Sequence, residues 1–234
     1  GRYVDPYSPF GTTDVRVSFV ANLHLCSPVP FVAEKLLGNA KSVPGHLIEV
    51  LGLVAGDAPL GIHQAASVHF KNSVKKGWDV TREDGNDGVV ISDQDRETIK
   101  SHVIQLMCTT PPQIQAQLSE AISLIAAVDY PRKWTNLMPE LVRQLDSTDP
   151  SVVNGLLKTA DGIFYSFRYV GRSDELYEKI QYSLDYIQAP LLSLFQSTGQ
   201  RVDGAVNDAA QLNSYLENLR VMSRIFFSLN YQDL

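Results

Sequence analysis

Apolar side chains recur at intervals of three and four residues along most of this chain, from about Val29 to the end. This spacing places them along one side of an α-helix, so each run predicts an amphipathic helix. No segment of comparable length alternates with a period of two, so the pattern predicts an all-α fold. The nine runs cover residues 32–37, 47–54, 62–74, 99–107, 114–125, 137–145, 152–167, 176–194 and 212–226.

The breaks between the runs carry helix-start signals. Asp149-Pro150 places a capping carboxylate before a proline suited to the first helical turn, and Ser173 precedes two acidic residues. Asp57-x-Pro59 and Asp129-x-Pro131 have a similar signature.

Prolines also begin alternate predicted helices, at Pro59, Pro112 and Pro150. Without the polar insertion at 81–88, their spacing is near the ~40–47 residues of a HEAT-type helix pair. We therefore expect an α-solenoid of HEAT repeats over residues 29–234, with antiparallel helix pairs stacked in tandem. It holds about four pairs and the first helix of a fifth, and residues 1–28 precede it as an irregular segment. Nine helices do not fit a single four-helix bundle.

Composition narrows the function classes. The formal net charge is −6, whereas nucleic-acid-binding proteins usually show a basic excess. No run approaches the ~18 apolar residues of a membrane span. Cys26 and Cys108 are far apart and show no metal-ligand spacing. We expect no nucleic-acid or membrane partner.

The sequence also contains no convincing catalytic or cofactor motif. The five histidines never form an i, i+4 pair with a third ligand. Residues 84–88 faintly resemble a calcium loop, but the glycine falls one place early, so a polar loop is the better interpretation. The sequence predicts no enzyme, no cofactor and no metal.

One local group of residues is a candidate binding surface: the basic cluster at Lys71, Asn72, Lys75 and Lys76. On a helix these side chains lie opposite Phe70 and its apolar neighbours. The cluster fits either a solvated face or a patch for an acidic partner surface. The two tryptophans, Trp78 and Trp134, are interpreted as packing residues at the ends of helix pairs.

Several segments resemble the karyopherin-β (importin-β) superfamily. Residues 65–78, AASVHFKNSVKKGW, are similar to a helix of its N-terminal domain, and residues 129–134, DYPRKW, to one of its turns. Residues 99–122 and 154–160 resemble its third and fourth repeats. The final segment, FSLNYQDL at 227–234, is similar to the branch of the superfamily that exports importin-α.

The resemblance implies a nuclear export receptor of HEAT repeats, without catalysis, that shuttles between nucleus and cytoplasm. It implies three partners: Ran bound to GTP, importin-α as cargo, and FG-repeat nucleoporins. This chain would be the N-terminal, Ran-facing part. Another karyopherin-β import receptor, or a HEAT-repeat scaffold with no link to Ran, remains an alternative.

The implied Ran-facing surface lies on inward helices near residues 46–54, 93–107 and 135–145. The residues that we expect to contact Ran are Lys71, Asn72, Lys75, Lys76, His46 and Glu49. A separate apolar strip is expected on the last helix at Phe226, Phe227 and Leu229.

Overall fold

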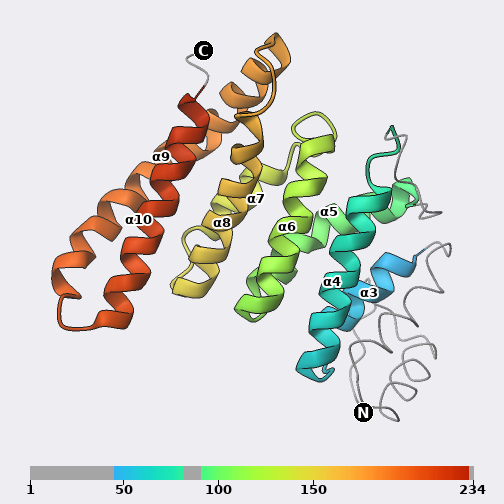
Figure 1. Cartoon of the computed structure of the whole chain (residues 1–234), viewed down its shortest axis with the longest axis horizontal. Helices are drawn as coiled ribbons and strands as arrows, with labels where there is room; N and C mark the ends of the chain where they lie inside the picture. The colour runs from blue at the N-terminus through green and yellow to red at the C-terminus, as the bar shows by residue number, and fades with distance from the viewer. Residues whose placement is uncertain (1–44, 82–90, 232–234) are drawn as a thin grey trace. The chain divides into compact units, whose positions relative to one another are not determined.

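The computed structural model describes residues 45–81 and 91–231, and every regular element in these ranges is an α-helix (Figure 1). Each of the eight apolar runs predicted between residues 47 and 226 coincides with one helix, which confirms the all-α class. The first run, the segment 1–28 and the loop at 84–88 lie outside the described residues. The helices are α3 (His46–Ala55), α4 (Leu60–Gly77), α5 (Asp93–Cys108), α6 (Pro112–Asp129), α7 (Leu137–Gln144), α8 (Pro150–Phe167), α9 (Asp174–Gly204) and α10 (Ala209–Asn230).

The chain divides into two compact units, Gly1–Ser101 and His102–Leu234. In the first unit, α3 packs against α4. The predicted apolar stripes are buried in both helices, from Val50 and Leu51 on α3 to Phe70 and Val74 on α4, each 1% exposed or less. Burial of these stripes is the main force that holds the pair together.

The second unit has two layers of helices. In Figure 1, α6, α8 and α10 lie side by side, and α8 contacts both neighbours. In the other layer, α7 packs against α8 and α9, and α9 packs against α10. This arrangement of paired helices in tandem is the one that the spacing of the prolines predicts.

Several helix starts follow the sequence signals. Asp149 Oδ1 accepts a hydrogen bond from Ser151 N at 2.8 Å at the start of α8, and Ser173 Oγ accepts one from Leu176 N at 3.2 Å at the start of α9. These bonds satisfy backbone donors that have no partner within the helix.

Two predicted caps are wrong. Asp129 is the last residue of α6, and the peptide bond that follows Tyr130 is cis. The next helix begins only at Leu137, behind Asn136, whose side chain makes no capping bond. At α4 the N-cap is Pro59, without a side-chain bond from Asp57. Neither Asp57 nor Asp129 stands at an N-cap, the position whose side chain can accept from the free N–H groups of the first helical turn.

The turn after α6 is closed by buried aromatic residues. Trp134 is 5% exposed, which confirms its packing role. Tyr130 is 2% exposed, and its hydroxyl lies 2.8 Å from Ser183 Oγ of α9. The turn therefore links α6 to α9 through a side-chain hydrogen bond as well as through packing.

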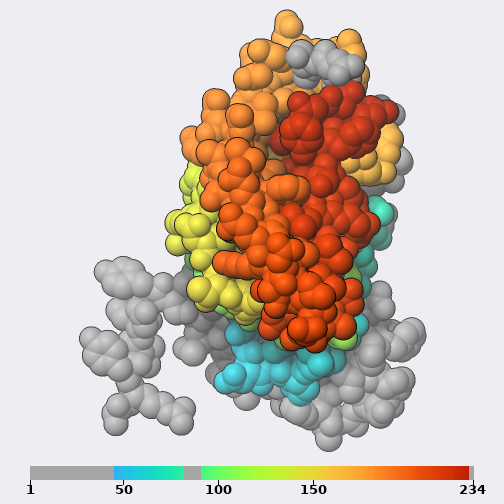
Figure 2. Space-filling view, turned by 90° about the vertical axis from the view of Figure 1, so that its left-hand side faces the viewer, coloured from blue at the N-terminus to red at the C-terminus, as the bar shows by residue number. Residues whose placement is uncertain are grey.

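The predicted apolar strip of α10 is correct for two of its three residues. Phe226 and Phe227 are exposed, whereas Leu229 is buried because it lies one turn beyond Ile225 on the core side. Figure 2 shows α9 and α10 side by side on one face of the second unit. Leu192 and Leu216 are also exposed on these two helices.

Candidate protein-binding surface

The predicted basic cluster lies on the last two turns of α4. Lys75 and Lys76 are exposed, and Lys71 and Asn72 are half-buried. The helix buries Phe70 and the rest of its apolar stripe in the first unit, so the cluster is displayed away from that core, as predicted. Three ammonium groups and one amide give this surface several hydrogen-bond donors.

His46 does not share that surface. It is 7% exposed, and its Nε2 lies 3.1 Å from Nε2 of His69 on α4. The two rings meet edge to face with centroids 5.3 Å apart. Burial lowers the pKa of His46, which favours the neutral imidazole. His46 thus belongs to the α3–α4 interface, and this placement argues against the predicted direct contact with a partner.

Glu49, one turn further along α3, is exposed. The start of that helix is fixed by Gly45, whose φ of 81° is readily adopted only by glycine. Gly45 N donates a hydrogen bond to Asp95 Oδ2 of α5 at 2.9 Å. Glu49 therefore lies on a helix whose N-terminus is hydrogen-bonded to α5 within the first unit.

The end of α4 is held by a residue that the sequence analysis missed. Arg96 on α5 donates from Nη2 to the carbonyl of Gly77 at 3.2 Å, and its guanidinium lies 4.7 Å from the ring centre of Trp78. Trp78 is 2% exposed, which confirms its packing role. Arg96 thus orients the turn that carries Lys75 and Lys76. An arginine near a tryptophan in space but 18 positions along the chain gives no local sequence signal.

The second unit offers a further polar surface on the helices that the resemblance places inward. Gln144 on α7 donates from Nε2 to Gln105 Oε1 of α5 at 2.8 Å. Beside it, Arg143 and Glu140 form an ion pair with a shortest distance of 2.6 Å. Arg143 lowers the pKa of Glu140, so this carboxylate remains charged. Burial raises the pKa of the neighbouring Cys108 thiol to about 11, which makes it a poor nucleophile at neutral pH.

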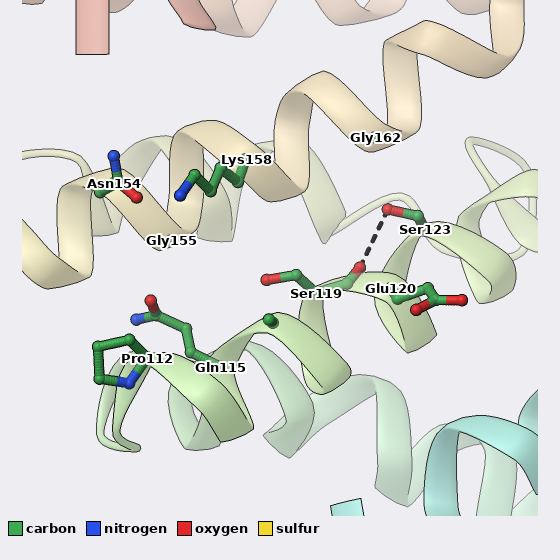
Figure 3. A pocket seen from close by; sticks show the side chains of 10 residues that line it. Pro112, Gln115, Ser119, Glu120, Ser123, Asn154, Gly155, Lys158 and Gly162 are labelled. Carbon is green, nitrogen blue, oxygen red and sulfur yellow. Dashed lines mark hydrogen bonds between the residues drawn. The ribbon is translucent and has the colours of Figure 1, made fainter. Parts of the chain in front are cut away.

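A groove of about 430 Å³ lies between α6 and α8 (Figure 3). Ser123 Oγ donates to the backbone carbonyl of Ser119 at 3.0 Å, and Thr159 Oγ1 lies 2.8 Å from Ser119 Oγ. No histidine is among the residues that line the groove. The serine hydroxyls there are engaged in structural bonds rather than paired with a general base.

The described part of the chain offers neither a metal site nor a membrane-spanning helix. No group of three His, Cys, Asp or Glu side chains converges as a metal site would require. None of the helices in the described ranges combines the length and apolarity that a membrane span needs. The geometry is that of exposed polar surfaces on stacked helices, which suits protein binding.

Comparison with known protein families identifies the class of protein to which the chain belongs. The family model for the importin-beta N-terminal domain matches residues 33–109, and the Cse1 family model matches residues 163–234. The chain belongs to the importin-β superfamily.

Within that superfamily, the chain is similar to exportin-2. It is 37% identical to exportin-2 of Homo sapiens over 202 residues, which cover 86% of this chain and 20% of the relative. Exportin-2 of Danio rerio is 36% identical with the same coverage. The chain thus spans about a fifth of the length of the curated relatives it matches.

Solved structures agree on the fold. The exportin Cse1 in its cargo-free, cytoplasmic state matches 93% of this chain and 23% of its own, with a TM-score of 0.78 and 28% identity. Lph2, a bidirectional nuclear transport receptor of S. cerevisiae, matches 93% of this chain and 21% of its own, with a TM-score of 0.71. At 18% identity, Lph2 supports the fold alone. These matches confirm both the predicted solenoid class and the resemblance to the karyopherin-β superfamily.

Proposed function

We propose that this chain is the N-terminal, Ran-facing part of a nuclear export receptor that carries importin-α from nucleus to cytoplasm. The observation that carries the proposal is the 37% identity to exportin-2 over 86% of the chain. The role is binding rather than catalysis. The receptor shuttles through the nuclear pore by weak contacts with FG-repeat nucleoporins.

Discrimination between the two states of Ran is the essential step. GTP orders the switch loops of such a GTPase, and hydrolysis releases them. A receptor responds to this change only if its contacts with the two loop states differ in free energy. Lys71, Asn72, Lys75 and Lys76, with Glu49, supply charged and amide groups that can pair with one arrangement of polar loop residues and not with the other.

Affinity in a complete receptor comes from several surfaces that act together. The chain spans about a fifth of the length of its relatives, so it contributes one part of the surface that binds Ran. Linked contacts act at high effective concentration, and a single one binds much more weakly. We therefore expect this chain alone to bind Ran weakly, and to support tight binding when joined to the remaining repeats.

A chimeric receptor tests this function. The matching N-terminal part of exportin-2 is replaced by this chain, and binding to GTP-locked Ran is measured with and without importin-α. An export receptor binds the two cooperatively. Release of cargo when Ran is added would instead indicate an import receptor, and equal affinity for the GTP and GDP forms of Ran would leave only a scaffold.

The basic cluster is tested in the same chimera. Replacing Lys71, Asn72 and Lys75 by Ala is expected to weaken Ran binding by about 1–3 kcal/mol if the cluster is buried in the interface. Lys158→Ala, at an exposed lysine of α8, is the matched control. Unchanged affinity of the triple variant, with helix content preserved by circular dichroism, would remove the cluster from the site.

A further inference from the structure

An unusual aromatic surface lies where α8 and α10 end. Arg168, the residue after α8, places its guanidinium 4.9 Å from the ring centre of Tyr165 and 4.6 Å from that of Phe227. Tyr169 contacts Tyr165 edge to face, with hydroxyls 2.6 Å apart, and Tyr231 contacts Phe227 in the same manner. We name these five residues the arginine–aromatic cluster.

The four rings of this cluster are exposed. Tyr165, Tyr169, Phe227 and Tyr231 show 41%, 72%, 52% and 50% of their surface. A contiguous group of exposed rings is uncommon on a soluble surface and marks an interaction site more often than a single exposed ring does. Because these rings already contact one another or the guanidinium, little side-chain freedom remains to be lost when a partner binds.

Hydrogen bonds hold the cluster in a defined shape. Arg168 donates from Nε and Nη2 to Ser228 Oγ at 3.0 and 2.7 Å, and from Nη2 to the carbonyl of Arg224 at 3.2 Å. These bonds join the end of α8 to the last turns of α10. The hydrogen bond between the Tyr165 and Tyr169 hydroxyls raises the pKa of Tyr169, so this exposed hydroxyl remains protonated, and its oxygen can still accept a hydrogen bond from a partner.

The helices that carry the cluster have more basic than acidic side chains, and we call the surface formed by these charged residues the ridge. α8, the turn after it and α10 carry five basic and two acidic side chains, a net charge of +3, within a chain whose net charge is −6. Arg224 Nη2 pairs with Asp161 Oδ2 at 2.8 Å, and Arg220 pairs with Glu217 at 2.8 Å. The basic residues are Lys158, Arg168, Arg172, Arg220 and Arg224, and the acidic ones are Asp161 and Glu217.

We propose that the arginine–aromatic cluster and this ridge form a docking site for an acidic peptide segment that carries an aromatic side chain. The exposed rings stack on the aromatic side chain of the peptide, and the ridge attracts its carboxylates. Charge complementarity selects this partner, because the ridge is locally positive on an acidic protein. The site lies wholly in the second unit, and it differs from the Ran-facing residues proposed on α3 and α4.

The test is a fluorescence-polarisation titration of the whole chain with a short fluorescent peptide of Asp and Glu around one Phe. Two comparison peptides either replace the acids by Lys or replace the Phe by Ala. The acidic aromatic peptide is expected to bind most tightly, and its affinity is expected to fall as salt is added.

Tyr169→Ala/Tyr231→Ala removes two exposed rings and leaves Arg168 in place. This variant is expected to weaken binding about tenfold, from the loss of two stacking contacts. Tyr177→Ala, at an exposed ring of α9 outside the cluster, is the matched control and leaves binding unchanged. Far-UV circular dichroism verifies that each variant is folded.

Three results would overturn the proposal: no saturable binding, equal binding of the Lys peptide, or equal loss in both tyrosine variants. A concentration-dependent dimer in sedimentation, abolished by Tyr169→Ala/Tyr231→Ala, would also overturn it, because it would assign the cluster to a second copy of the chain.

Discussion

Gly155 of α8 offers a sharp test of how the second unit is packed. A Cβ atom at this position would lie 2.3 Å from Cδ of Gln115 on α6, well inside contact distance. Gln115 is 5% exposed, and its Nε2 lies 3.5 Å from the carbonyl of Met107. Figure 3 shows Gln115 on α6, below the segment of α8 that carries Gly155. Gly155→Ala therefore forces the Gln115 amide to move within a buried space.

Two opposing effects determine how much Gly155→Ala changes the free energy of unfolding. Alanine is better than glycine within a helix by about 1 kcal/mol. Against this, displacing the buried Gln115 amide to make room for the added methyl group costs about 1–3 kcal/mol. Taking about 2 kcal/mol for this cost gives a net loss of about 1 kcal/mol in the free energy of unfolding.

The assay is urea unfolding followed by far-UV circular dichroism. Gly199→Ala in α9 is the matched control, since no atom outside the adjoining backbone lies within 4 Å of its added Cβ. It is expected to stabilise the chain by about 1 kcal/mol. In a Gln115→Ala background the obstruction is gone, so Gly155→Ala is also expected to stabilise by about 1 kcal/mol, a coupling of about 2 kcal/mol.

The reasoning fails if Gly155→Ala stabilises the original chain as much as Gly199→Ala does. That outcome would mean that α6 and α8 are not in close contact at Gln115. An equal loss in both backgrounds would also refute it, because the cost would then come from something other than the Gln115 side chain.

Two further predictions concern buried ionisable groups. His46 has a folded-state pKa below its ordinary value of 6.5, so the unfolded chain binds more protons between the two values and stability falls as pH drops through that window. His46→Gln is expected to flatten the pH dependence of the urea midpoint there, and an unchanged slope would contradict the assignment. Arg224→Ala leaves the buried Asp161 without its ion pair and is expected to cost about 2 kcal/mol at neutral pH. Burial raises the pKa of Asp161, so the loss should shrink in acid as this carboxyl protonates, and Arg224→Ala/Asp161→Asn should recover stability at neutral pH.

The helices were predictable because the burial pattern is local. A side chain that recurs every three or four residues lies on one face whatever its neighbours are, so all the runs between 47 and 226 mark real helices. The caps at Asp149 and Ser173 were predictable for the same reason, since both act within three residues of themselves.

Burial of polar residues was predicted less well. His46 stands four residues before Val50 and eight before Val54, both buried, so its position on the apolar stripe of α3 indicates the core side. Lys100, 6% exposed and paired with Glu97 at 2.6 Å, is a similar exception to the usual exposure of lysine.

Contacts between helices distant in sequence could not be predicted at all. The arginine–aromatic cluster joins Arg168 to Phe227 and Ser228, about sixty positions further on, and nothing in either segment marks the other. The contact of Arg96 with Trp78 was missed for the same reason. Only the packing of α8 against α10, and the contact of the end of α4 with the first turns of α5, makes these residues neighbours.

The packing of the helices also bears on how fast the chain folds. The main packing contacts join helices that are adjacent or next but one along the chain, such as α3 with α4 and α6 with α8. Short sequence separations between contacting residues favour rapid folding, because little chain entropy is lost before native contacts form. Each hairpin can therefore assemble on its predecessor during synthesis, before the remaining helices have left the ribosome.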